Sequence, residues 1–406
     1  MNKNFWGGMV VGALIAMAVS FIGFFMIGGG SLNPLPKPDI IPDRPSYDED
    51  TDFEDKINEL KEYIDEMYLF TDRYDEEKLE QGIYKGMFES LDDIYSVYYT
   101  PEEYASLIES SSGSYSGIGC YVQLDLDTGA IILVRPMRNS PAMEAGIQPG
   151  DILVEVNGES VVGRDLDSVV AMIKGEEGTS VTLGILREGE EDLLQIEVRR
   201  AHIEVDTISY EMLENQIGYI KIEEFDTVTM YQFNDAVDDL EGQNMQKLII
   251  DVRDNPGGSL TCVLNILDRL LPEGELLRIV DRDGNEEIYK GDSRYQVDVP
   301  IAVLVNGDSA SASEVFSGCM KDRGAAVIVG TNTFGKGIVQ SVIGLDDGSG
   351  FKITTQEFFT PSGNTIHGVG IAPDVEVELD EELRGKMDIP HDQDNQLQKA
   401  IEVLGN

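Results

Sequence analysis

The chain has 406 residues, a length that predicts two or three folded domains with connecting segments. Its 76 acidic residues against 30 Lys and Arg give a formal net charge of -46, so no binding to nucleic acid is expected, because phosphates require a basic partner. With 41% hydrophobic residues, the chain has enough apolar side chains to bury cores and is not a disordered polyanion.

From Phe5 to Gly30 the sequence carries no charge. At about 1.5 Å per residue this stretch reaches roughly 39 Å, which is enough to cross a bilayer. The residues that follow lack a small-residue cleavage site, which favours an uncleaved signal-anchor over a removed signal peptide. We therefore expect residues 1–30 to be a transmembrane signal-anchor with a short N-terminal tail.

Residues 31–50 are rich in proline, which predicts an extended linker. Residues 51–112 carry apolar side chains at three- and four-residue spacing, which predicts a helical N-terminal region of two or three amphipathic helices. Across 31–112 there are 23 acidic and 7 basic residues, typical of solvated helix faces.

Short β-runs fill residues 113–200. From 201 to 385 strands alternate with helices expected over 229–241, 260–271 and 312–321, which indicates βαβ units and a mostly parallel sheet. Residues 386–406 are expected to form a C-terminal helical tail. The predicted fold class is multi-domain α/β.

Cysteines and histidines are few and scattered, with no C-x-x-C pair and no close His/Cys cluster. No disulfide framework and no metal site are therefore expected. The six residues are Cys120, Cys262, Cys319, His202, His367 and His391.

Residues 113–200 resemble a PDZ domain. The motifs that carry the resemblance are GIGC (117–120), SPA (140–142), AGI (145–147), PGDIL (149–153) and VNG (156–158). A glycine-rich turn before an edge strand exposes successive backbone N–H groups that can bind a C-terminal carboxylate while the peptide adds as a strand. The expected contacts are Gly117, Ile118, Gly119 and Cys120, and the expected partner is a protein or peptide with a free C-terminus.

Two further motifs each follow an apolar strand: NGDSASASE (306–314) and TFGKGIVQ (333–340). Together with the PDZ segment they resemble the carboxyl-terminal processing peptidases, also called tail-specific proteases, which use a Ser-Lys dyad. Further matching motifs lie at 95–104, 251–258, 360–363 and 371–375. The resemblance implies a ClpP/crotonase-like α/β protease core, no cofactor, a location outside the cytoplasm and a possible homodimer.

Three serines compete as the nucleophile. The family separates serine and lysine by 25 residues, so Lys336 points to Ser311, and Ser309 and Ser313 become helix-start and packing residues. Gln340 matches the third member of the family's site and is expected to orient the lysine amine.

A lysine acts as a base only when its amine is neutral, so its pKa of about 10.4 must fall by about 3 units. No Asp or Glu lies between Gly324 and Leu345, so the local sequence permits this shift. The competing mechanism is a Ser-His-Asp triad that uses His367, but no acid is paired with this histidine in the sequence.

The oxyanion that forms during acyl transfer needs preorganised N–H donors. The family resemblance assigns them to Gly257 and Ala312, and the choice between Gly257 and Gly258 stays open.

The predicted function is a membrane-anchored serine endopeptidase of the cell membrane, single-pass, with PDZ and protease domains outside the cytoplasm. It would recognise exposed C-termini and cleave the chain by acyl-enzyme chemistry. A binding scaffold without turnover and a crotonase-like acyl-CoA enzyme are the alternatives. One departure from the family is Lys174, where arginine is common, so coupling between the PDZ domain and the active site is expected to be looser.

Overall fold

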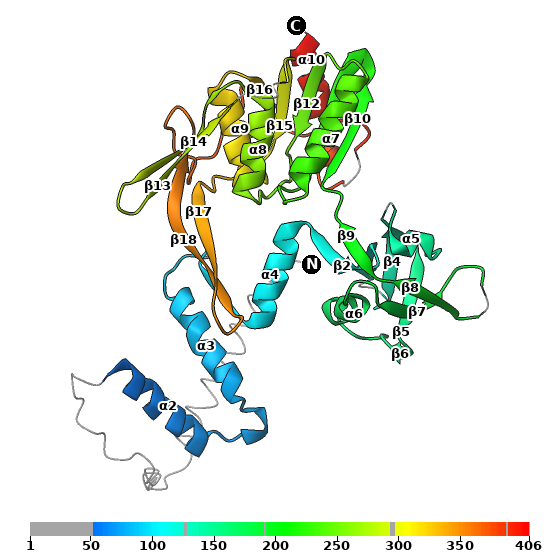
Figure 1. Cartoon of the computed structure of the whole chain (residues 1–406), viewed down its shortest axis with the longest axis vertical. Helices are drawn as coiled ribbons and strands as arrows, with labels where there is room; N and C mark the ends of the chain where they lie inside the picture. Colours follow the sequence, from blue (N-terminus) through cyan, green and yellow to red (C-terminus); the bar gives the residue numbers. More distant parts are fainter. Residues whose placement is uncertain are drawn as a thin grey trace, which may run out of the picture. The chain divides into compact units, whose positions relative to one another are not determined.

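The computed structural model describes residues 52–125, 128–137, 139–190, 192–292, 297–386 and 389–405 (Figure 1). The signal-anchor and the linker expected over 1–50 lie outside these residues. In the described part, none of the helices has the length and apolar character needed to cross a membrane. The chain divides into two compact units, Met1–Glu76 and Glu77–Asn406.

The helical N-terminal region contains α2 (Phe53–Met67), α3 (Glu76–Glu89) and α4 (Pro101–Ser112), so the expected helices are confirmed. A capping box fixes the start of α4, since the Thr100 hydroxyl accepts from Glu103 N and the Glu103 carboxylate accepts from Thr100 N at 2.9 Å. A strand that the sequence did not predict, β1 (Val97–Tyr99), lies between α3 and α4.

The PDZ segment folds into an antiparallel sheet with the order β3-β4-β5-β7-β8. Strand β3 is therefore an edge strand, as peptide addition requires. The elements are β3 (Cys120–Leu124), β4 (Ile131–Pro136), α5 (Pro141–Glu144), β5 (Asp151–Val156), β6 (Glu159–Ser160), α6 (Leu166–Ile173), β7 (Ser180–Leu186) and β8 (Leu194–Arg199). A two-stranded ribbon, β2 (Ser114–Gly117) with β9 (Ala201–Glu204), flanks it in sequence.

The first sheet of the protease core has the order β10-β11-β12-β15-β16-β19. All neighbours are parallel except β10, which pairs antiparallel with β11. The strands are β10 (Ile208–Leu213), β11 (Ile217–Ile222), β12 (Lys247–Asp251), β15 (Ile301–Val305), β16 (Ala326–Gly330) and β19 (Val375–Glu376). The expected helices are confirmed as α7 (Thr229–Gly242), α8 (Leu260–Leu270) and α9 (Ala312–Asp322).

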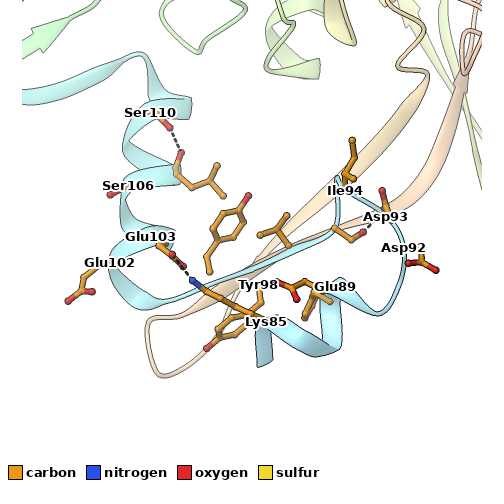
Figure 2. A pocket seen from close by; sticks show the side chains of 15 residues that line it. Lys85, Glu89, Asp92, Asp93, Ile94, Tyr98, Glu102, Glu103, Ser106 and Ser110 are labelled. Carbon is orange, nitrogen blue, oxygen red and sulfur yellow. Dashed lines mark hydrogen bonds and ion pairs between the residues drawn. The ribbon is translucent and has the colours of Figure 1, made fainter. Parts of the chain in front are cut away.

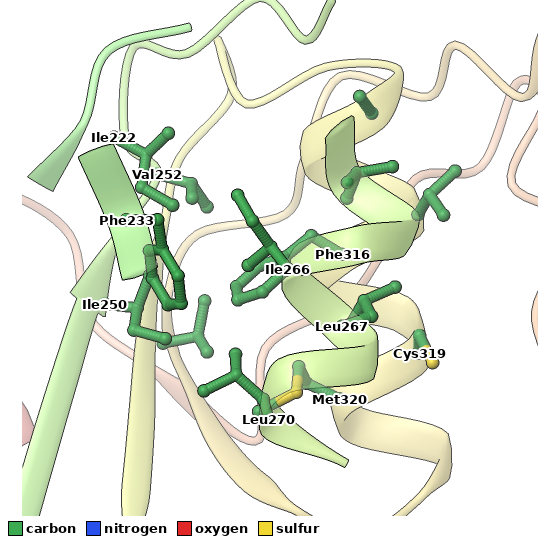
Figure 3. Packing of buried hydrophobic residues seen from close by; sticks show 14 of the residues in the cluster. Ile222, Phe233, Ile250, Val252, Ile266, Leu267, Leu270, Phe316, Cys319 and Met320 are labelled. Atoms are coloured by element: carbon green, nitrogen blue, oxygen red, sulfur yellow. The ribbon is translucent and has the colours of Figure 1, made fainter. Parts of the chain in front are cut away.

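Successive side chains of a strand point to opposite faces of the sheet, so the buried strands contribute to a hydrophobic core on each face. Leu248 and Ile250 join the apolar cluster that α7, α8 and α9 cover, as Figure 3 shows for Ile250 facing the residues of α8 and α9. Ile249 points to the opposite face, where it packs with Leu397 of α10 (Asn395–Gly405). The C-terminal helix is thus part of the protease core.

A second sheet of the core is antiparallel, with the order β1-β18-β13-β14 and with β17 also paired to β18. Its strands are β13 (Gly274–Asp281), β14 (Glu286–Gly291), β17 (Ile338–Gly344) and β18 (Gly350–Phe359). The alternation of strands and helices indicates only the parallel sheet, so the sequence prediction was incomplete here. This sheet brings β1 against β18, with Tyr98 opposite Phe351.

A buried ion-pair network connects β12 to the C-terminal helix. The Arg253 guanidinium binds Asp251 and also Asp394, which precedes α10, at 2.6 and 2.8 Å. Burial alone would raise the pKa of Asp394, but the hydrogen bonds and charge of Arg253 lower it below its ordinary value. Breaking such a pair from one side leaves an uncompensated buried charge.

Candidate active site

Ser311 lies at the turn between β15 and α9, directly before the first residue of the helix. Its backbone has φ 54° and ψ -113°, a conformation that non-glycine residues rarely adopt. Such backbone strain gathers at functional sites, and strand-to-helix turns of this kind expose a serine nucleophile.

The two neighbouring serines are fully buried and hydrogen-bonded. Ser309 Oγ donates to Val252 O at 2.7 Å, and Ser313 Oγ donates to Asn255 O at 2.9 Å. Ser313 therefore joins the serine loop to the DNPGG turn (254–258), and Ser309 joins it to the residue that follows β12. Of the three serines, Ser311 alone is partly exposed to solvent.

Gly257 lies against the serine loop. A Cβ at this position would come within 2.8 Å of Ser311 Cβ and 2.9 Å of Ala312 N, and φ is +110°, so only glycine permits this approach. Gly258 instead packs on Phe225, whose carbonyl oxygen would lie 2.4 Å from an added Cβ. The structure thus brings Gly257 and Ala312 beside Ser311.

The Gly257 N–H is already occupied. It donates to Asn255 Oδ1 at 2.8 Å, while Asn255 Nδ2 donates to Ile222 O at 2.8 Å. An oxyanion could accept a hydrogen bond from the Gly257 N–H only by displacing the Asn255 side chain.

A buried carboxylate, Glu314, joins the serine and lysine loops. Its oxygens accept from Ser311 N at 2.9 Å and from Lys336 N at 2.8 Å. They also accept from Gly335 N at 2.7 Å and from Thr333 Oγ1 at 2.6 Å. Glu314 is 0% exposed, and four donors to one carboxylate supply the hydrogen bonds that burial of the charge requires.

No role for Glu314 was predicted from the sequence. A signal was present, because Ser311 and Glu314 have the S-x-x-E spacing of a capping box at a helix start. The further contacts to residues 333–336 come from a loop 19 or more positions away and have no local signature.

Lys336 lies in a partly buried environment that lowers its pKa. Burial is the main cause and the nearby charge of Lys352 adds to it, whereas Asp93 and Glu314 act in the opposite direction. The uncharged segment around Lys336 excluded only carboxylates near it in sequence, and two acids distant in sequence approach it in the fold. The Lys336 Nζ lies 4.5 Å from the centroid of the Tyr95 ring.

Other predicted contacts are not seen among the described residues. The Gln340 amide donates to Ile338 O at 3.3 Å and makes no hydrogen bond to Lys336. No hydrogen bond joins Ser311 Oγ to Lys336 Nζ there either. His367 is exposed and bonds to no carboxylate in this part of the chain, which gives a Ser-His-Asp triad no support.

The turn before β1 reaches the same site from the N-terminal region, through Tyr95. Asp93 accepts from Ser96 Oγ at 2.6 Å and from Thr354 Oγ1 of β18 at 2.7 Å. Its other oxygen accepts from Tyr95 N at 3.0 Å. These bonds attach the turn to β18 and place Tyr95 over Lys336.

In the PDZ domain, Gly117, Ile118, Gly119 and Cys120 are all buried. Gly119 has φ +70°, and an added Cβ would lie 2.5 Å from Ser140 Cβ. Among the described groups, the backbone N–H groups of Ile118 and Gly119 have no acceptor. Two adjacent free donors beside an edge strand match the geometry expected for carboxylate binding.

Lys174 follows α6 and pairs with Glu109 of α4. Its Nζ also lies 4.9 Å from the ring centroid of Tyr115 in β2. The lysine thus connects the PDZ domain to the helix that precedes it, as one charge without the two-pronged geometry of arginine.

In the described part of the chain, no group of three or more His, Cys, Asp or Glu side chains is placed so that it could hold a metal ion. The three cysteines are buried and free.

Comparison with known proteins identifies the class. A model of peptidase family S41 matches residues 216–377, and a PDZ domain model matches residues 132–187. The carboxy-terminal processing protease CtpB of Bacillus subtilis (strain 168) is 34% identical over 385 residues, covering 93% of this chain and 78% of that protein. CtpA of the same strain is 37% identical over 326 residues, covering 80% and 69%.

A crystal structure of a candidate S41 protease from Bacteroides fragilis NCTC 9343 has a TM-score of 0.50 at 17% identity, covering 79% of this chain and 90% of that one. At this identity the likeness shows the fold alone. The two Bacillus relatives carry the assignment: this chain is a serine-type peptidase of the carboxy-terminal processing class. It belongs to peptidase family S41, and the resemblance seen in the sequence is confirmed.

Replacing Glu314 with Gln tests whether its carboxylate holds the site together. The amide would turn an N–H group toward N–H donors, so we expect kcat for a peptide substrate to fall at least about tenfold and the protein to lose about 1–3 kcal/mol of stability. Steady-state kinetics and thermal unfolding measure the two effects. Exposed Glu382→Gln is the matched control, and wild-type kcat in Glu314→Gln would contradict the assignment.

Proposed function

We propose that the chain is a membrane-anchored endopeptidase in which Ser311 is the nucleophile and Lys336 the general base. The observation that carries the proposal is the single Glu314 carboxylate that accepts hydrogen bonds from the backbone of both residues. This shared partner holds the strained serine turn and the lysine loop side by side. The lowered pKa of Lys336 favours the neutral amine that a base requires.

In this mechanism the Lys336 amine takes the Ser311 hydroxyl proton as Oγ attacks the scissile carbonyl. The protonated lysine then gives its proton to the departing amine, which leaves an acyl-enzyme. Water attacks the ester, lysine again acts as base, and the new carboxyl end is released with Ser311 restored. Gln340 would orient the amine after a side-chain rotation away from Ile338 O.

The oxyanion would be bound by the Ala312 N–H together with a donor from the DNPGG turn. Gly257 is the donor that lies against Ser311, and its N–H becomes available when the Asn255 side chain releases it. Gly258 packs on Phe225 and is not placed against Ser311 by the contacts that place Gly257 there.

The PDZ domain would select the substrate by its free C-terminus. The Ile118 and Gly119 N–H groups would bind the terminal carboxylate, and the edge of β3, which begins at Cys120, would pair with the preceding residues. Gly117 supplies the turn that presents these donors. Substrates would then be proteins or peptides with accessible C-termini.

The uncharged segment 5–30 supports a single-pass anchor in the cell membrane, with the PDZ and protease domains outside the cytoplasm. A homodimer would have to use the N-terminal helices, since the apolar face of α10 packs on the core sheet.

Removing either proposed catalytic group tests the mechanism. We expect Ser311→Ala and Lys336→Ala to lower kcat/KM on an unfolded protein such as β-casein by about 10³-fold or more. The first variant lacks the nucleophile, and the second lacks the base that activates it. Cleavage is followed with the detergent-solubilised full chain. Full activity in either variant would overturn the assignment.

The same assay separates the remaining alternatives. A scaffold without turnover would give a wild-type chain as inactive as Ser311→Ala, and it would not be labelled at Ser311 by a fluorophosphonate. His367→Ala is the control for a triad, and it should retain at least half of the wild-type kcat.

Carboxylate recognition is tested with two peptides that differ only at the end. In the Ser311→Ala chain, a peptide with a free apolar C-terminus should bind at least about tenfold more tightly than its C-terminal amide, since the amide removes the charge that the N–H groups would bind. Fluorescence anisotropy gives both dissociation constants. Equal affinities would remove this role from residues 117–120.

The anchor is tested by deleting residues 5–30. The full chain should stay in membranes after an alkaline carbonate wash, and the deleted chain should become soluble. Protease added outside intact cells should digest the globular domains if they lie outside the cytoplasm, and light scattering of the detergent-solubilised chain reports a homodimer. A full chain released by carbonate would contradict the anchor.

A further inference from the structure

The turn from Asp93 to Ser96 lies outside both matched family segments, yet it contacts the lysine of the active site. Its position is fixed from β18, because Ser96 Oγ accepts from Thr354 N at 3.0 Å and Asp93 accepts from the Thr354 hydroxyl. Strand β1, which follows, pairs with β18 in register from Val97 to Tyr99. The turn is therefore built into the second core sheet.

The half-buried Tyr95 ring contacts the Lys336 ammonium at a centroid distance of 4.5 Å, well inside the range of a cation–π interaction. In the described part of the chain the ammonium forms no hydrogen bond with Ser311 or Gln340. The aromatic face is thus the observed partner of the group that would act as base.

We propose that Tyr95 is a positioning residue for Lys336, because the face of its ring stabilises the charged amine and fixes where the amine lies in the site. The proposal rests on the function proposed above for Lys336. It adds a residue of the N-terminal region to the control of that base.

The other groups around Lys336 act by charge. Lys352 on β18 disfavours the ammonium, whereas Asp93 on the turn and Glu314 on α9 favour it. Tyr95 also favours the ammonium, although it carries no net charge, because the negative face of its ring attracts a cation. A substitution at 95 therefore changes the balance without altering the formal charge of the site.

The turn has space on its other side. A cavity of about 1050 Å³ lies between α3, β1 and α4, and Asp93, Ile94 and Ser96 line it (Figure 2). Ile94 at the tip of the turn is 83% exposed. The hydrogen bonds of Asp93 and Ser96 to Thr354 hold the turn in place although this side of it is open.

The test measures the pKa of Lys336 directly in the full chain with Ser311→Ala, by competitive acetylation with acetic anhydride at a series of pH values and peptide mass spectrometry. Tyr95→Leu keeps the bulk and removes the aromatic face, so the Lys336 titration midpoint should fall by roughly half a pH unit. Tyr95→Phe should keep the wild-type midpoint. Tyr99→Leu, in strand β1 directly after the turn, is the matched control and should not shift it.

If Tyr95→Leu does not fold, fluorinated phenylalanines at position 95 keep the ring shape and weaken its negative face, and the midpoint should fall with each added fluorine. An unchanged or raised midpoint in these variants, or an equal shift in Tyr95→Phe, would overturn the proposal.

Activity gives a second reading in the Ser311 chain. One pH unit below the Lys336 midpoint, kcat/KM of Tyr95→Leu should be about threefold higher than wild type, because a larger fraction of the amine is neutral. A shifted labelling midpoint with an unshifted activity profile would support the contact between Tyr95 and Lys336 while contradicting Lys336 as the base.

Discussion

The architecture of the site depends on one buried carboxylate. Among the described residues, Glu314 has no cation within hydrogen-bonding distance, and its partners are three backbone N–H groups and the Thr333 hydroxyl. Burying a charge is costly unless hydrogen-bond donors surround it. The serine turn and the lysine loop must therefore stay where their N–H groups can bind the Glu314 carboxylate. The strained backbone of Ser311 is stabilised by the same hydrogen bond.

The lysine environment shows how a highly acidic chain can still lower the pKa of a lysine. The surplus of carboxylates is concentrated in the N-terminal helical region and near the C-terminus, with none between Gly324 and Leu345. Folding nevertheless brings Asp93 and Glu314 near Lys336, and burial together with Lys352 outweighs them in lowering its pKa. The net direction is set by a balance of neighbours, with Tyr95 contributing through its ring.

Much of the fold could be predicted from local pattern. The helices at 229–242, 260–270 and 312–322 and the buried strands follow from apolar periodicity, and the serine and lysine motifs each follow a strand. The antiparallel sheet of β1, β13, β14, β17 and β18 did not follow, because two of its pairings are non-local: β1 pairs with β18 across more than 200 residues, and β13 pairs with β18 across a helix and two strands of the other sheet. The packing of α10 on the core also required the tertiary structure.

The sequence by itself determined the family and the order of its motifs, and it led to the proposal of Ser311 over its neighbours, since these depend on residue identity and spacing along the chain. Only the tertiary structure decided which groups surround them: Glu314 between the loops, Asn255 on the Gly257 N–H, and Tyr95 on Lys336. The reason is physical. A pKa or a hydrogen bond is set by neighbours within a few ångströms, and the fold chooses these neighbours from any distance along the chain.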